Sequence, residues 1–299
     1  MSYLMYLLAC GGTDEARSPV AFRSTLRTPT AGVELFDNGE TGRAGMYDVS
    51  CPFQTINGTV TGDYDMPGEG ETVTDAGDTE LGPETAAVVG ADRVDLVESS
   101  RVEDRVMSID VPGVVDARLV DGEVVAWVDQ AGACSVVWTD SGRVVEADCG
   151  RGFDAIDEDQ VVVVGASGTR ILGVGGVEAE IPGAADLVVW DDLASVAYVA
   201  ELGGHVVTAI EANGLVRWTT DVDGAITALD AAGDRAAATV AVSRGDVGAL
   251  LWLDGASGLM LGEVETPAAP ESLSISANGE ALAVVLRDET HFYDLVLPR

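Results

Sequence analysis

A hairpin pattern that recurs along most of the chain constrains the fold more than any other feature. Its clearest copy is 205–230, HVVTAIEANGLVRWTTDVDGAITALD. Residues 206–210 are rich in β-branched side chains, and Asn213-Gly214 is a strong signal for a tight turn between two strands. The chain returns through 215–219 and turns again at Asp223-Gly224 into a third strand. The pattern therefore predicts an all-β protein made of short antiparallel strands.

These strands group into units of four. The units start near residues 115, 153, 186, 226 and 272, a spacing of about 33–46 residues. Four strands at this period are typical of a β-propeller, in which each sheet is a blade and the ring of blades buries both faces of every sheet. An earlier blade occupies 85–113, with its first strand near 70–80. We expect six blades, with five or seven as alternatives and a double β-sandwich as the rival architecture.

The last unit, from 272 to the end of the chain, is one strand short. Because the first and last blades of a propeller must meet, we expect an N-terminal strand from 33–62 to complete it. The predicted organisation has three parts: a short apolar segment over 1–9, which is the expected lipoprotein signal, a tether over 10–32 and the propeller over 33–299. Residues 63–84 are acidic and rich in glycine, which favours a surface loop.

The charge of the chain argues against one class of partner. The formal net charge is −35, from 51 acidic residues against 16 basic residues, all of them arginine. A surface of this kind repels phosphate backbones, so we expect no nucleic-acid binding. It suits a cationic partner, divalent cations or solubility in high salt.

The start of the chain resembles the signal of bacterial lipoproteins. The apolar run MSYLMYLLA ends at Cys10, and the four residues Leu7-Leu8-Ala9-Cys10 resemble the lipobox. The resemblance implies cleavage before Cys10 and acylation of that cysteine. We therefore expect a protein of the bacterial cell envelope that is attached to the membrane by its lipid alone. The alternative is a cytoplasmic protein with an apolar N-terminus.

Two cysteines flank a predicted hairpin. Cys134 and Cys149 are equidistant from a turn centred on Ser141-Gly142, so an unslipped register places them directly opposite each other. Cross-strand neighbours on one face are close enough for a disulfide, and we expect this bridge, which indicates an oxidising compartment. The alternative is two buried free thiols. Cys51 has no obvious partner, and the absence of a C-x-x-C pair argues against a zinc site.

Two parts of the chain resemble known propeller repeats. Residues 206–218, VVTAIEANGLVRW, resemble the PQQ-like (quinoprotein) repeat, which implies that Trp218 lies on an outer strand and docks against the next blade. Residues 250–262 follow the same pattern with Gly262 in place of the tryptophan. The last unit, 273–295, resembles a WD-repeat or YVTN-type blade, with Tyr293-Asp294 where Trp-Asp would stand. These resemblances imply the fold, and propellers serve many functions.

Carboxylates recur in the loops between the first and second strands of the predicted blades. Asp157 and Asp159 lie in one such loop, and Asp191 and Asp192 lie in the next. If the loops share one rim, these oxygens form an acidic ring that binds Ca²⁺. The alternative is that aspartate simply favours turns. The same place in other units is taken by Asp121, Asp234 and Asn278.

No set of residues predicts catalysis. His205 and His291 are interpreted as structural or solvent-facing, and the chain has no G-x-S-x-G nucleophile motif. The leading hypothesis is a monomeric, non-catalytic propeller scaffold, anchored at Cys10, that binds another envelope protein or a small ligand. The alternatives are a propeller hydrolase or lactonase with a central metal held by carboxylates, and a cytoplasmic WD-type scaffold.

Overall fold

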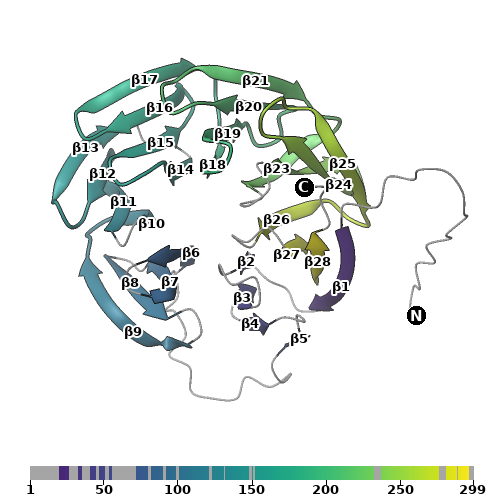
Figure 1. Ribbon diagram of the computed structural model, residues 1–299, viewed down its shortest axis with the longest axis horizontal. Helices are drawn as coiled ribbons and strands as arrows, with labels where there is room; N and C mark the ends of the chain where they lie inside the picture. The colour runs from purple at the N-terminus through teal and green to yellow at the C-terminus, as the bar shows by residue number, and fades with distance from the viewer. Residues whose placement is uncertain are drawn as a thin grey trace, which may run out of the picture.

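The short β-branched runs and glycine turns of the sequence form antiparallel strands in a computed structural model of the protein. The described strands make seven four-stranded sheets, which are arranged as blades round a central axis (Figure 1). This confirms the all-β propeller prediction. The structure describes residues 20–26, 33–35, 41–44, 47–50, 54–55, 72–79, 82–89, 92–98, 101–120, 123–130, 132–147, 150, 152–231, 237–275, 281–287 and 289–295.

In the first three sheets, consecutive strands are neighbours in chain order. They are β2 (Val33–Leu35), β3 (Thr41–Ala44), β4 (Tyr47–Ser50) and β5 (Gln54–Thr55); β6 (Thr72–Thr79), β7 (Gly82–Val89), β8 (Arg93–Glu98) and β9 (Arg101–Asp110); β10 (Val114–Val120), β11 (Glu123–Gln130), β12 (Ala133–Trp138) and β13 (Arg143–Ala147).

The next three sheets repeat this meander, and the last sheet ends at the C-terminal strand. They are β14 (Gly152–Ala155), β15 (Gln160–Val164), β16 (Gly168–Gly173) and β17 (Gly176–Pro182); β18 (Leu187–Asp191), β19 (Val196–Ala200), β20 (Val206–Ile210) and β21 (Val216–Asp221); β22 (Ala225–Ala231), β23 (Ala237–Arg244), β24 (Val247–Asp254) and β25 (Met260–Thr266); β26 (Pro270–Ile275), β27 (Ala281–Leu286) and β28 (Glu289–Leu295) with β1 (Val20–Leu26).

The last blade takes its fourth strand from the N-terminal part of the chain. β1 pairs antiparallel with β28, from Val20 opposite Leu295 to Leu26 opposite Thr290. We expected a closing strand from 33–62, and this is corrected, because that region forms the sheet β2–β5. Part of the predicted tether is therefore β1.

The preferred count of six blades is also corrected, since the described strands form seven sheets. The additional sheet is β2–β5, whose strands have only three, four, four and two residues. Runs this short carry little periodic signal. β6 confirms the first strand expected near 70–80, although its sequence TVTDAGDT lies within the acidic segment 63–84 that favoured a loop.

The core lies between neighbouring blades. On β15, Val161 and Val163 belong to a cluster shared with β11 and β12, whereas Val162 and Val164 belong to a cluster shared with β19 and β20. Successive side chains of a strand point to opposite faces, so both faces of this sheet are covered. This explains why the sequence of β15 is a continuous apolar run rather than an alternating one.

The pairing of β1 with β28 predicts that the ring depends on the N-terminal strand. Deleting residues 1–26 leaves the outer edge of β28 without its neighbour, and we expect the thermal midpoint to fall by about 5 °C or more. Circular dichroism during heating measures this midpoint. Deleting only residues 1–19 retains β1 and is the matched control. Equal midpoints for the two truncated chains would contradict the role of β1 in closure.

Candidate functional site

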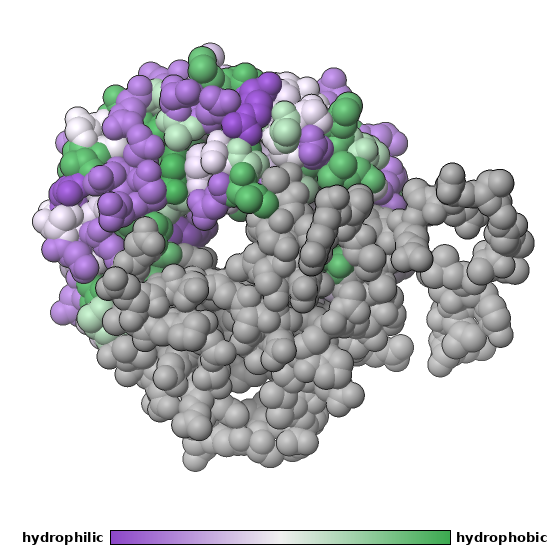
Figure 2. All heavy atoms as spheres, viewed as in Figure 1, coloured by the Kyte–Doolittle hydropathy of each residue, from purple (hydrophilic) through white to green (hydrophobic). Residues whose placement is uncertain are grey.

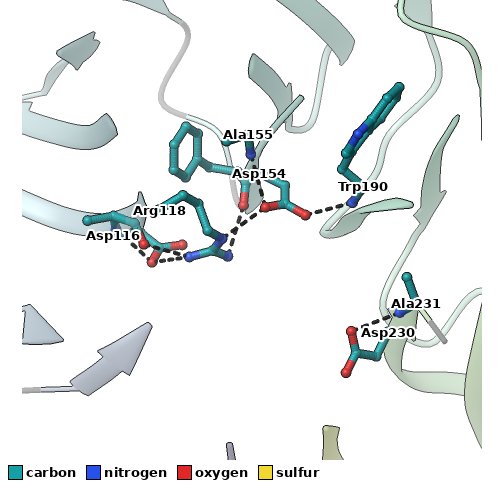
Figure 3. Close-up of polar contacts among 9 residues, drawn as sticks. Asp116, Arg118, Asp154, Ala155, Trp190, Asp230 and Ala231 are labelled. Carbon is teal, nitrogen blue, oxygen red and sulfur yellow. Dashed lines mark hydrogen bonds and ion pairs between the residues drawn. The ribbon is translucent and has the colours of Figure 1, made fainter. Parts of the chain in front are cut away.

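An Asp-Ala pair recurs on the innermost strands of four blades, of which β6 carries Asp75-Ala76. The other three pairs have described contacts, and they are Asp116-Ala117 on β10, Asp154-Ala155 on β14 and Asp230-Ala231 on β22. In each pair, the backbone N–H of the alanine donates to the preceding carboxylate, at 2.9, 2.9 and 2.8 Å respectively. Figure 3 shows this arrangement together with Arg118 of β10. We call these three aspartates and Arg118 the axial cluster.

Asp154 connects three blades. Its Oδ1 accepts a hydrogen bond from Arg118 Nε at 3.0 Å, and its Oδ2 accepts one from the backbone N–H of Trp190 at 2.6 Å. Arg118 belongs to the preceding blade and Trp190 to the following one. Figure 3 draws both contacts as dashed lines. Arg118 also donates to Asp116 at 2.7 Å and to the carbonyl oxygen of Phe153 at 3.1 Å. A single carboxylate therefore satisfies a guanidinium and a backbone donor from different sheets.

Asp230 repeats this contact two blades further along the ring. Its Oδ2 accepts a hydrogen bond from the backbone N–H of Ile275, on β26 of the following blade, at 2.8 Å. Burial raises the pKa of Asp230 to about 7, and the negative charge of Asp154 adds to this rise. Burial also raises the pKa of Asp154, against the lowering effect of Arg118.

The hydrogen bonds of the axial cluster join neighbouring blades. Both oxygens of Asp154 and of Asp230 accept hydrogen bonds from groups of the protein. This cluster was not predicted from the sequence. The signal that identifies it is the Asp-Ala pair that recurs within the first strand of a unit.

The predicted calcium ligands have separate roles. Asp157 accepts hydrogen bonds from the backbone N–H groups of Asp159 and Gln160, both at 2.8 Å, so it closes its own turn. The side chain of Asp159 pairs with Arg143 of the preceding blade at 2.9 Å. These two carboxylates are therefore occupied by a turn and by a surface ion pair.

The second predicted pair is divided between the interior and the surface. Asp191 is buried, and it accepts hydrogen bonds from the backbone N–H of Ala194 and from the Tyr198 hydroxyl, both at 2.8 Å. Burial raises the pKa of both Asp191 and Tyr198. Asp192 accepts a hydrogen bond from the indole N–H of Trp190 at 2.6 Å. One side chain thus stabilises the interior of a blade, and its neighbour fixes a tryptophan.

Among the described residues, no group of three or more His, Cys, Asp or Glu side chains is placed to bind a metal ion. Asp121, Asp234 and Asn278 lie outside those residues. His205 Nδ1 lies 2.6 Å from the carbonyl oxygen of Gly224, and His291 Nε2 lies 3.0 Å from Glu289.

The part of the chain that the structure describes has no helix long and apolar enough to cross a membrane.

Trp218 lies on the outer strand β21 and contacts the following blade. Its indole N–H donates to the carbonyl oxygen of Gly255 at 2.9 Å, and its ring lies against Gly258 in the same turn. Thr220 reinforces this contact with a hydrogen bond from its hydroxyl to the carbonyl oxygen of Gly258, at 2.9 Å. On its own blade, the ring of Trp218 lies 5.7 Å from that of Tyr198. The residue therefore links two blades at the outside of the ring.

Cys134 lies on β12, and its register differs from the expectation. It pairs across the ladder with Ala147 instead of Cys149, because Trp138 pairs with Arg143 and the turn is centred one residue earlier. Thr139, which follows β12 directly, donates from both its N–H and its hydroxyl to the carbonyl oxygen of Val124 on β11. Cys134 is disulfide-bonded. Its pairing with Cys149 stays a prediction, because Cys10, Cys51 and Cys149 lie outside the described residues.

Comparisons with solved structures show the fold. The chain is similar to a chain of a mitotic checkpoint complex, with a TM-score of 0.68, 12% identity and 98% of each chain covered. It is also similar to the Cps50 (Swd1) β-propeller domain of Myceliophteria thermophila, with a TM-score of 0.67, 9% identity and coverage of 93% and 100%. BBS1N in complex with ARL6DN matches with a TM-score of 0.53, 16% identity and coverage of 72% and 75%. No family model and no curated protein matches the sequence.

The contact between Trp218 and Gly258 predicts a substitution with a large effect. A Cβ at Gly258 would lie 2.7 Å from the Trp218 ring, and the backbone φ there is +70°, so Gly258→Ala separates the two blades and strains the turn. Gly245→Ala is the matched control, because its φ is +78° and nothing lies within 4 Å. We expect the free energy of unfolding to fall by about 2 kcal/mol more for Gly258→Ala. Denaturant titration measures the difference, and equal losses would argue against docking by Trp218.

The raised pKa of Asp230 predicts a specific dependence of stability on pH. The folded chain holds this proton to about pH 7, whereas an unfolded aspartate loses it near its ordinary value of 3.8. Because the folded state binds more protons across this window, the contribution of Asp230 to the free energy of unfolding decreases as pH rises from about 4 to 7.

Asp230→Asn removes the titrating group. We expect the change in free energy of unfolding between pH 4.5 and 7.5 to differ from that of the wild type by about 1 kcal/mol or more. Denaturant titration at both pH values measures this difference, whatever the absolute stability of the variant. The same pH dependence in both proteins would show that Asp230 does not titrate as described.

Proposed function

We propose that this chain is a non-catalytic scaffold of the bacterial cell envelope that binds other proteins. The observation that carries the scaffold role is the use of the polar groups at the axis. Asp154 and Asp230 are the buried carboxylates that an active site would need, and their oxygens accept hydrogen bonds within and between blades. Such a ring offers a rigid surface for binding.

The structural likenesses support this role without identifying a partner. Two of the similar solved structures are assemblies, a mitotic checkpoint complex and BBS1N with ARL6DN. Those proteins are found with protein partners. Because identity to them is 12% and 16%, the scaffold role is our inference for this chain from its fold and its occupied axial cluster.

The envelope location rests on the N-terminal sequence and on cysteine chemistry. Leu7-Leu8-Ala9-Cys10 resembles a lipobox, and a disulfide at Cys134 is consistent with an oxidising compartment. A lipid on Cys10 would attach the propeller to the membrane and leave its faces free for partners.

Labelling with a fatty-acid probe in a bacterial host tests the anchor. We expect the chain to incorporate the probe, Cys10→Ala to abolish the incorporation, and globomycin to leave a labelled chain that is uncleaved and therefore heavier. Cys51→Ala is the matched control and should retain the label. Absence of label in the wild type, or label that persists in Cys10→Ala, would overturn the lipid anchor.

Cross-linking and affinity capture of a tagged chain test the scaffold role. We expect defined protein partners to be recovered at the same yield from the wild type and from Cys51→Ala. Turnover of lactone substrates by the purified chain, abolished by EDTA, would instead show a metal-dependent hydrolase and overturn the proposal.

A further inference from the structure

The outer strands of three successive blades carry an exposed apolar strip. It consists of residues on, or directly before, β17, β21 and β25, and we call it the apolar ledge. Figure 2 shows that hydrophobic side chains interrupt the hydrophilic surface of the described blades. The members of the ledge and their exposed fractions are Val177 (54%), Leu215 (64%), Val216 (49%), Leu259 (69%), Met260 (49%) and Leu261 (41%).

The ledge is continuous from blade to blade because each turn before an outer strand lies against the preceding outer strand. A Cβ at Gly214 would lie 2.5 Å from the Cβ of Ala179 on β17. A Cβ at Gly258 would lie 2.7 Å from the ring of Trp218 on β21. Leu215 and Leu259 follow these glycines directly, so each is beside the strand of the neighbouring blade.

A β-bulge recurs at the same place in all three outer strands. The ladders between the third and fourth strands shift register there, which leaves Glu178, Arg217 and Leu261 as the additional residues. Bulges twist an edge and interrupt its row of hydrogen-bonding groups. The ledge is therefore poorly suited to the addition of a strand, and recognition there depends on side chains.

The charge of the outer strands determines the kind of occupant. They contain five acidic residues and a single basic one, Arg217, which pairs with Glu211 at 3.1 Å. Of the five, Glu180 pairs with Arg170 and Glu263 pairs with Arg244. A second copy of the chain or an anionic lipid surface would bring like charge against them. A basic partner is complementary. The acidic residues are Glu178, Glu180, Asp221, Glu263 and Glu265.

We propose that the apolar ledge binds a basic amphipathic segment of another protein. The apolar side of the segment covers Leu215 and Leu259, and its basic side faces the acidic residues of the outer strands. This inference rests on the proposed scaffold function and assigns it a binding surface.

A synthetic peptide of leucine and lysine, patterned as an amphipathic helix, serves as the probe. Fluorescence anisotropy measures its affinity for the wild type and for Leu215→Ser/Leu259→Ser. We expect the double variant to bind about tenfold more weakly, since exposed apolar side chains carry the contact. Leu202→Ser/Val247→Ser is the matched control, because both residues are exposed and lie at the opposite ends of the strands. Equal affinity of the peptide for the wild type and the Leu215/Leu259 variant would overturn the proposal.

A second peptide, in which serine replaces every leucine and the lysines are kept, tests whether charge alone explains the binding. We expect this peptide to bind weakly and equally to both double variants. If it binds the wild type as tightly as the amphipathic peptide, attraction to the net charge explains the binding and the inference fails. Sedimentation of the wild type tests a second copy as occupant, and a dimer that Leu215→Ser/Leu259→Ser abolishes would also overturn the proposal.

Affinity capture distinguishes a wrong inference about the ledge from a wrong proposal of the scaffold role. If the tagged Leu215→Ser/Leu259→Ser chain captures the same partners as the wild type at equal yield, the ledge inference falls and the scaffold role stands. Loss of a partner in this variant alone, with an unchanged thermal midpoint, supports both.

Discussion

The packing of apolar sheet faces against one another is the constraint on which the rest of the structure depends. On β19, Val196, Tyr198 and Ala200 pack toward the β22–β25 blade, while Ala197 and Val199 pack toward the β14–β17 blade. A sheet with two apolar faces is stable only between two neighbours, so the arrangement ends only when the ring closes. The prevalence of valine and alanine, with only 5% aromatic residues, keeps the facing side chains small.

Apolar packing has little directional preference, so polar contacts fix the orientation of each blade relative to the next. Near the axis, Asp154 and Asp230 bind backbone N–H groups of the following blades, and at the outside Trp218 binds the carbonyl oxygen of Gly255. The two sets act at opposite ends of the radius and so limit rotation of one blade against the next. The raised pKa of Asp230 is the physical consequence of burying a carboxylate for this purpose.

Much of the fold was predictable from the sequence because the strand pattern is local. The tight turn at Asn213-Gly214 and the apolar run of β15 need no knowledge of the rest of the chain. The strand that closes the ring was assigned wrongly, because β1 and β28 pair across almost the whole sequence and no local signal links them. The axial cluster was missed for a similar reason. Asp154 is one aspartate among many until the fold brings Arg118 and Trp190 to it from two other sheets.

The direction of the β1–β28 pairing also determines how the ring responds to mechanical force. Val20, at the start of β1, lies opposite Leu295, at the end of β28, so the two ends of the chain leave this pair from the same side. Tension applied through the two ends acts along the hydrogen bonds between the strands, which run perpendicular to them. The hydrogen bonds are then loaded one after another, beginning at Val20. The β1–β28 pair therefore unzips under a small force instead of resisting in shear.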